Sequence, residues 1–137
     1  EEQASSSELK RAGGSMARYS MLVLSRPVAG QDEAYNDWYQ NTHLQQIVSL
    51  PGFVSAQRFK LRVNMRGENA YPYAAIYEID TDDVDAAFAA LEKASSDGSL
   101  IMAPSFDTET VYASIYEPLG ELVCESAAGS GPGNEGG

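Results

Sequence analysis

Apolar residues dominate or alternate with polar ones along four short stretches of the chain, which is the pattern of strands in a sheet. The stretches are residues 19–26, 53–63, 72–79 and 108–116. The first is largely apolar and is followed by Pro27, as expected of a strand that is buried on both faces. The second alternates strictly, with Phe53, Gln57 and Phe59 in one set, and the polar residues 64–69 after it predict a hairpin loop.

Two other stretches carry apolar residues at helical spacing. The first begins after the turn and acidic residues at 30–33, and the second spans residues 84–94 after Thr81-Asp82-Asp83, whose side chains are typical of helix caps. The predicted order is therefore βαββαβ. This order predicts an α+β, ferredoxin-like domain, in which a four-stranded antiparallel sheet carries both helices on one face.

The first helix changes its phase partway along. Tyr35, Trp38, Tyr39 and Thr42 cluster within about 100° of the helix circumference, and Leu44, Ile47 and Val48 lie well off that stripe. One straight helix cannot bury both sets, so we expect a bend or break near residues 41–43 and a second short turn over residues 45–50. His43 would then lie beside the aromatic stripe and face the space between helix and sheet.

The face of the sheet without helices is also predicted to be apolar. In the third strand, Tyr73, Tyr77 and Ile79 alternate with Ala74 and Ile76, so both faces carry apolar side chains. A second copy packed face to face would cover the open face and close the sheet edges. We expect a homodimer, a dimeric α+β barrel whose two sheets enclose a central space; the alternative is a monomer with tyrosines on an open face.

Composition and charge limit the classes of partner that we expect for this protein. The 137 residues, 43% of them hydrophobic, suit a single domain. A net charge of −11 repels a phosphate backbone and an anionic lipid surface, so we expect neither nucleic acid nor membrane as a partner. The single Cys124 cannot form an internal disulfide, and no apolar run approaches the ~20 residues that span a bilayer. A cytoplasmic protein is expected.

The two ends of the chain differ from its middle. Residues 1–15 are small, polar and charged and end directly before Met16, so we interpret them as an artificial or disordered leader. Residues 121–137 are predicted to be a flexible tail, because positions 126–137 are nearly all small or turn-forming. The barrel domain is accordingly assigned to residues 16–120.

The candidate site centres on His43, the only histidine of the chain. Imidazole exchanges its proton near neutral pH, so His43 is the predicted acid/base, with the phenols of Tyr39 and Tyr77 as donors to a developing enolate. Arg58 is a candidate to hold a carboxylate bidentately. Together with Arg58, the predicted substrate-binding residues are Tyr35, Trp38, Tyr73, Tyr112 and Tyr116.

Structural roles for these residues stay open from the sequence alone. His43 could be a hydrogen-bonded histidine at a helix end, and the tyrosines could be core residues with their hydroxyls at the rim. Arg58 could belong with Lys60 and Arg62 to a solvated strand edge. Asp37 and Asn41, one turn apart, either orient His43 or face water.

The run Tyr35-Asn36-Asp37-Trp38-Tyr39, followed by Asn41-Thr42-His43-Leu44 and Leu50-Pro51-Gly52-Phe53, resembles the EthD-like members of the dimeric α+β barrel superfamily. The resemblance covers about residues 18–119. It implies a homodimeric barrel with one small-molecule pocket per subunit, in which the position of His43 serves as an acid/base or pocket residue. Relatives include cyclases, dehydratases, decarboxylases, isomerases, anthrone-type monooxygenases and haem-degrading enzymes. Some place a second histidine near the first, so a two-histidine mechanism is not expected here.

Three function classes follow. The first is an enzyme without cofactor that performs lyase, isomerase or cyclase chemistry on an aromatic, polyketide-like or cyclic substrate. The second is an anthrone-type monooxygenase, also without cofactor, and the third is a non-catalytic, ligand-binding or stress-associated barrel dimer. The chain has no glycine-rich nucleotide loop and no nucleophile elbow, and one histidine with one distant cysteine does not make a zinc site, so no metal is expected. Residues 95–104 are predicted to form a lid or a dimer contact.

Overall fold

The structure is a computed structural model that describes residues 17–68 and 70–125. Along the chain the elements are β1 (Ala17–Ser25), α2 (Asp32–Trp38), the π-helical turn η1 (Tyr39–His43), α3 (Leu44–Val48), β2 (Phe53–Lys60), β3 (Tyr73–Thr81), α4 (Val84–Ser96) and β4 (Tyr112–Tyr116). The leader predicted at residues 1–15 lies outside the described residues, as do positions 126–137 of the tail predicted at 121–137.

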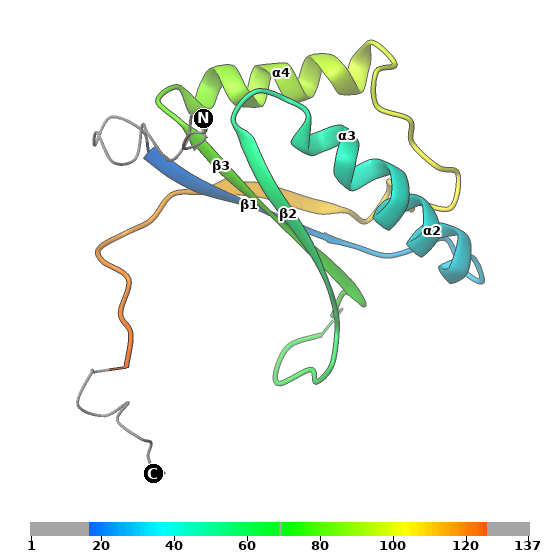
Figure 1. Cartoon of the computed structure of the whole chain (residues 1–137). Coiled ribbons are helices and arrows are strands. Elements are labelled where there is room, and N and C mark those ends of the chain that lie inside the picture. Colours follow the sequence, from blue (N-terminus) through cyan, green and yellow to red (C-terminus); the bar gives the residue numbers. More distant parts are fainter. Residues whose placement is uncertain (1–16, 69, 126–137) are drawn as a thin grey trace.

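The four strands form one antiparallel sheet in the order β2-β3-β1-β4. All helices lie on one face of this sheet, with α4 running above the strands and α2 and α3 beside it (Figure 1). The α+β, ferredoxin-like arrangement predicted from the sequence is therefore confirmed.

The core fills the space between the helices and the sheet. Strand residues Met21, Val23, Ala75, Tyr77 and Ile79 are buried there, because alternate positions of neighbouring strands point to the same face. The helices contribute a second set of buried residues, Tyr35, Tyr39, Leu44, Ile47 and Ala87. Aromatic side chains from α2 and η1 thus lie directly above the central strands.

Strand β2 differs from its prediction at both ends. A bulge between Phe53 and Ser55 shifts the alternation, so Phe53 is buried under the helices, whereas Gln57 and Phe59 lie on the opposite face. The strand ends at Lys60 although the apolar alternation continues to residue 63. The chain leaves the sheet there because β3 begins only at Tyr73, so residues 62–68 have no partner strand.

Strand β4 is shorter than the predicted 108–116. The Asp107 carboxylate accepts hydrogen bonds from the Glu109 N–H (3.0 Å) and the Thr110 hydroxyl (3.1 Å), which fixes a turn. Residues 108–110 therefore belong to a turn, and pairing with β1 begins at Tyr112.

The helix-free face carries apolar side chains, as predicted. Phe59 is 44% exposed and Tyr116 is 50% exposed, and half-buried Leu22, Leu24 and Ile76 lie between them on β1 and β3. The β2–β3 loop and the segment after β4 both extend from the sheet on the side away from the helices (Figure 1). The homodimer that would cover this face stays a prediction.

Candidate functional site

The phase change of the first helix is produced by a π-helical turn. The Leu44 N–H donates to the carbonyl of Tyr39, five residues earlier, so η1 holds one residue more than an α-helical turn. The extra residue lets Tyr39 and His43 face the core together with Leu44 and Ile47, all four of them buried. The predicted change of phase is produced without a break, because the helix continues through η1 into α3.

His43 is enclosed by aromatic rings. Its imidazole is 8% exposed, stacks on the indole of Trp38 with ring centroids 4.6 Å apart, and meets the ring of Tyr39 edge-on at 5.1 Å. Its buried Nδ1 has no hydrogen-bond partner. Burial among these rings lowers the pKa of His43 from 6.5 to about 4, because desolvation disfavours the charged form. The imidazole is therefore neutral at neutral pH.

Three buried tyrosines form a polar cluster next to His43. The Tyr35 hydroxyl shares a hydrogen bond of 2.5 Å with Ser25, and the hydroxyls of Tyr39 and Tyr77 bond each other. Burial raises the pKa of Tyr39 to about 12 and also raises the pKa of Tyr77 and Tyr35. All three phenols are consequently protonated and able to donate.

Arg58 reaches this cluster from β2. Its guanidinium carbon lies 4.6 Å from the ring centroid of Tyr39 and 5.5 Å from those of Tyr35 and Tyr73. Its Nη2 donates to the Asn36 Oδ1 at 2.6 Å. The cation is therefore held among aromatic faces, an arrangement that cation–π attraction favours.

The loop between α4 and β4 covers the other side of Trp38. The Trp38 Nε1–H donates to the Ile101 carbonyl at 2.8 Å, and the Ile101 N–H donates to the Gln46 Oε1 at 3.2 Å. Phe106, at the end of the loop, contacts the rings of Tyr35 and Trp38. Residues from the predicted lid are thus bonded to the helix that carries His43.

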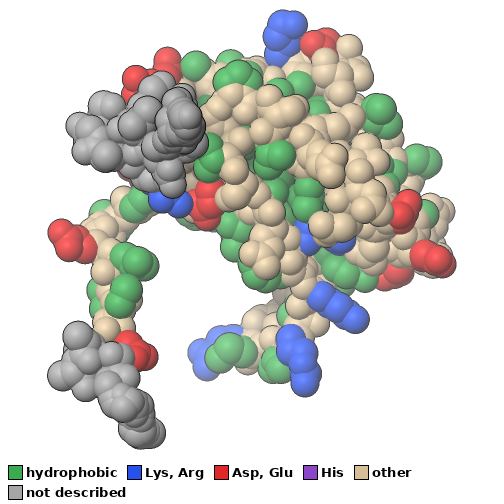
Figure 2. Space-filling view, in the orientation of Figure 1, with side chains coloured by type: hydrophobic (Ala, Val, Ile, Leu, Met, Phe, Trp, Pro, Cys, Tyr) green, Lys and Arg blue, Asp and Glu red, His purple; other side chains and the backbone are tan. Residues whose placement is uncertain are grey.

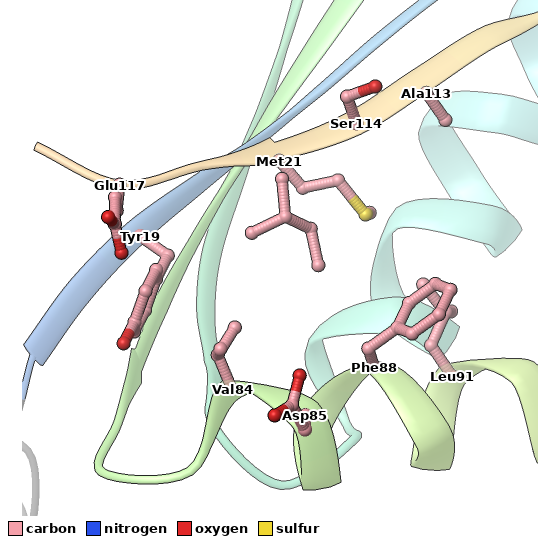
Figure 3. A pocket seen from close by; sticks show the side chains of 10 residues that line it. Tyr19, Met21, Val84, Asp85, Phe88, Leu91, Ala113, Ser114 and Glu117 are labelled. Atoms are coloured by element: carbon pink, nitrogen blue, oxygen red, sulfur yellow. The ribbon is translucent and has the colours of Figure 1, made fainter.

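The largest of three cavities lies between α4 and the strands β1 and β4. It measures about 500 Å³, and Figure 3 shows Phe88 and Leu91 extending from α4 toward the sheet and Met21 extending from β1. Tyr19, Asp85 and Glu117 supply its polar groups. On β3, Tyr77 pairs with Met21, so the wall of this cavity adjoins the tyrosine cluster.

A second cavity of about 300 Å³ adjoins the cluster from the β2 edge, where Arg58 and Tyr73 line it. The third lies between Gly52, α4 and the β3–α4 turn, away from the aromatic cluster. None of these three is lined by His43, Tyr39 or Tyr77. In this arrangement the candidate acid/base is enclosed.

The predicted site residues divide between the two faces of the sheet. His43, Tyr39, Tyr77, Tyr35, Trp38, Arg58 and Tyr73 come together under the helices. Tyr112 and Tyr116 lie on the helix-free face, since their positions alternate with those of Ala113 and Ile115, which pair with the core residues Val23 and Met21. They are hydrogen-bonded to each other there.

The sequence did not predict a role for two residues of the cluster, Asn36 and Ser25. Asn36 follows Asp32 by four residues, and both contact the Tyr73 hydroxyl, so their helical spacing was the available signal. Ser25 carried no comparable signal, because a serine at a strand end is common. Asp37 and Asn41 bond each other on the exposed side of the helix at 2.8 Å.

Metal ligands and membrane-spanning helices were considered only for residues 17–68 and 70–125, the described residues. They contain no group of three or more His, Cys, Asp or Glu side chains placed to hold a metal ion. None of the helices they form is both long enough and apolar enough to cross a membrane.

Comparison with models of protein families finds no match, and comparison with curated protein sequences finds none either. Among solved structures, the chain is similar to a NIPSNAP family protein of unknown function from Agrobacterium tumefaciens, with 10% identity and a TM-score of 0.52 over 74% of this chain and 88% of that one. It is also similar to a DABB family protein with a ferredoxin-like fold from Mesorhizobium loti, with 12% identity and a TM-score of 0.50 over 76% and 99%.

An EthD family protein from Bacillus halodurans is similar at 16% identity, with a TM-score of 0.48 over 74% of this chain and 99% of that one. Identities this low establish a shared fold and no shared reaction. The ferredoxin-like fold implied by the sequence resemblance is the property that this chain has in common with the DABB family protein.

Proposed function

We propose that the protein is an enzyme without cofactor that transfers protons on a small aromatic, polyketide-like or cyclic substrate, with lyase, isomerase or cyclase chemistry as the outcome. The observation that carries this proposal is His43, a buried neutral imidazole whose Nδ1 lacks a partner. A buried polar atom without a partner costs free energy, and such atoms call for an explanation, of which a catalytic role is one.

The chemistry divides between the imidazole and the phenols. Neutral His43 accepts a proton from a substrate carbon or hydroxyl, and its low pKa makes the protonated form a strong acid that returns the proton quickly. Tyr39 and Tyr77 remain protonated, and because they bond each other, one hydroxyl hydrogen of the pair is free to donate to the oxyanion that develops on the substrate. Arg58 adds a positive charge beside Tyr39.

Substrate reaches His43 when the α4–β4 loop moves. Two hydrogen bonds, both at Ile101, join this loop to Trp38 and Gln46. Breaking them uncovers the indole that stacks on His43, and the loop thereby serves as the predicted lid.

The assembled enzyme is a homodimer. A second copy of the chain on the helix-free face buries Phe59, Ile76 and Tyr116, and the β2–β3 loop and the segment after β4 extend toward the space that this copy would occupy (Figure 1).

Proton transfer is tested by following deuterium incorporation from D2O into a panel of cyclic ketones, aromatic ketones and β-dicarbonyl compounds by NMR. We expect the wild type to accelerate exchange for at least one compound and His43→Gln to slow it by roughly 10²–10⁴-fold. Gln45→Ala, an exposed neighbour on α3, is the matched control and keeps the wild-type rate. Equal rates for wild type and a folded His43→Gln variant would refute the role of His43.

Non-catalytic ligand binding is the second candidate, and the enclosure of His43 away from all three cavities favours it. Ligand binding without exchange on any compound of the panel would support this candidate. The monooxygenase alternative differs from both, because it consumes oxygen during turnover, which an oxygen electrode measures.

A further inference from the structure

The cavity at the β2 edge has a cationic lining. Its residues are Asn36, Gln40, Arg58, Phe59, Lys60 and Tyr73. Two of them are positively charged and none is negatively charged, in a chain whose net charge is −11. Lys and Arg side chains gather over the end of β2 and the loop that follows it (Figure 2), where Arg58, Lys60, Arg62 and Arg66 come in close succession.

Within residues 17–68 and 70–125, no carboxylate forms an ion pair with Arg58. The ion pairs formed by the described residues are Arg18–Glu78 and Lys93–Asp97. Arg58 is half-buried and donates instead to a neutral amide, the Asn36 Oδ1, and its buried Nε has no hydrogen-bond partner. A partly desolvated guanidinium without a counter-ion is costly, and an anionic ligand would relieve that cost.

The guanidinium is also held in place. The Asn36 Nδ2 donates to the Tyr73 hydroxyl at 3.1 Å, and that hydroxyl donates to the Asp32 Oδ2 at 3.2 Å. Because this chain of bonds fixes Asn36, and three tyrosine rings surround the guanidinium, Arg58 keeps little freedom to lose when a ligand binds. The Asp32 carboxylate accepts from Tyr73 and forms no ion pair with Arg58.

We propose that this cavity binds a small organic carboxylate with a planar apolar body. The carboxylate accepts hydrogen bonds from Arg58 and pairs with Lys60, and the planar body lies against the ring of Tyr73. The polar amides of Asn36 and Gln40 orient further oxygen atoms. This inference rests on the proposed function, because the cavity adjoins the tyrosine cluster that is proposed to act on the same substrate, and it is tested by binding alone.

The test is calorimetric titration of the whole chain with benzoate, and with benzamide as the neutral compound of the same shape. We expect benzoate to bind and benzamide to bind at least about tenfold more weakly, because charge-assisted hydrogen bonds are the stronger kind. Arg58→Gln should weaken benzoate by roughly tenfold to a hundredfold. Arg62→Gln, which removes an exposed charge from the same chain segment, is the control and keeps the affinity within about twofold.

A second variant tests the same inference in case Arg58→Gln does not fold. Asn36→Asp keeps the shape of the side chain and gives Arg58 an internal counter-ion, so the variant should fold and lose benzoate binding. The inference is overturned if benzamide binds as well as benzoate, if Asn36→Asp binds benzoate like the wild type, or if inorganic phosphate competes with equal affinity, which would indicate a general anion site.

The outcomes for this cavity and for His43 are separable. His43→Gln leaves the cavity residues unchanged and should bind benzoate while failing to exchange deuterium. Loss of exchange with retained binding therefore supports both proposals, and retained exchange with no benzoate binding supports the His43 proposal alone.

Discussion

Burial of the His43 imidazole makes the free energy of unfolding depend on pH. The dependence has the opposite sign to that of a histidine whose pKa is raised on folding. In the unfolded chain His43 titrates near its ordinary pKa of 6.5, and in the folded chain only near 4. Between these pH values the unfolded chain binds more protons than the folded chain. The contribution of His43 to the free energy of unfolding is therefore complete above pH 6.5 and is lost as the pH falls toward 4.

We expect the wild type to lose about 2 kcal/mol of unfolding free energy relative to His43→Gln between about pH 7.5 and pH 5. The measurement is urea unfolding of both proteins across this range, with the difference between them taken at each pH so that shared carboxylate titrations cancel. A constant difference across the range would mean that His43 is solvated or carries a counter-ion in the folded protein.

The sequence predicted most residues of the aromatic cluster. It did not predict the hydrogen bonds that their polar atoms form. The helical spacing of Tyr35, Trp38 and Tyr39 indicated their shared face, and burial followed from it. The partners of their polar atoms depend on three strands that pair only in the folded chain, so neither the Ser25–Tyr35 bond nor the Asn36–Arg58 bond was predictable.

Among the elements, η1 is the one that regular helix geometry would not produce. A π-turn amounts to one residue inserted into an α-helix, and such turns are frequent at functional sites. The insertion keeps Tyr35 and Ile47 on the buried side of a continuous helix while it changes the direction in which His43 points.

Deletion of Asn41 should therefore convert η1 into ordinary α-helix without loss of fold. We expect a free energy of unfolding equal to or above that of the wild type, since both flanking apolar faces keep their phase, together with loss of deuterium exchange. Circular dichroism during urea unfolding and the exchange assay measure the two properties. A clear loss of stability would show that the π-turn is needed for packing and not for the site.

Element order followed from the sequence because periods of two and of 3.6 residues are set by strand and helix geometry. The ends of the elements did not follow from the sequence, because they depend on which strand lies beside them. The alternation of residues 61–63 continues where β3 offers no partner strand, and the bulge at Val54 reverses the face of Phe53, which the strict alternation had grouped with Phe59.

The open face of the sheet is the surface on which the proposed homodimer would form. Tyr116 lies on this face and is half exposed, so a charge there costs a monomer little and a face-to-face dimer a great deal.

We expect the wild type to be a dimer at micromolar concentration and Tyr116→Arg to be a folded monomer, with light scattering after size exclusion as the measurement. Phe88→Arg changes an apolar residue that is 45% exposed on α4, on the other side of the sheet, and should remain dimeric. A monomeric wild type would remove the dimer from the proposed function.

The two edges of the sheet limit how copies of this chain can associate. An unprotected edge strand invites a further strand and, through it, open-ended aggregation. Edge strand β4 is only five residues long, and edge strand β2 ends in Lys60, with Arg62 two residues beyond. Neither edge offers a long uncharged template, so growth along the hydrogen-bonding direction is discouraged, and in the proposed face-to-face dimer association would end with the second copy.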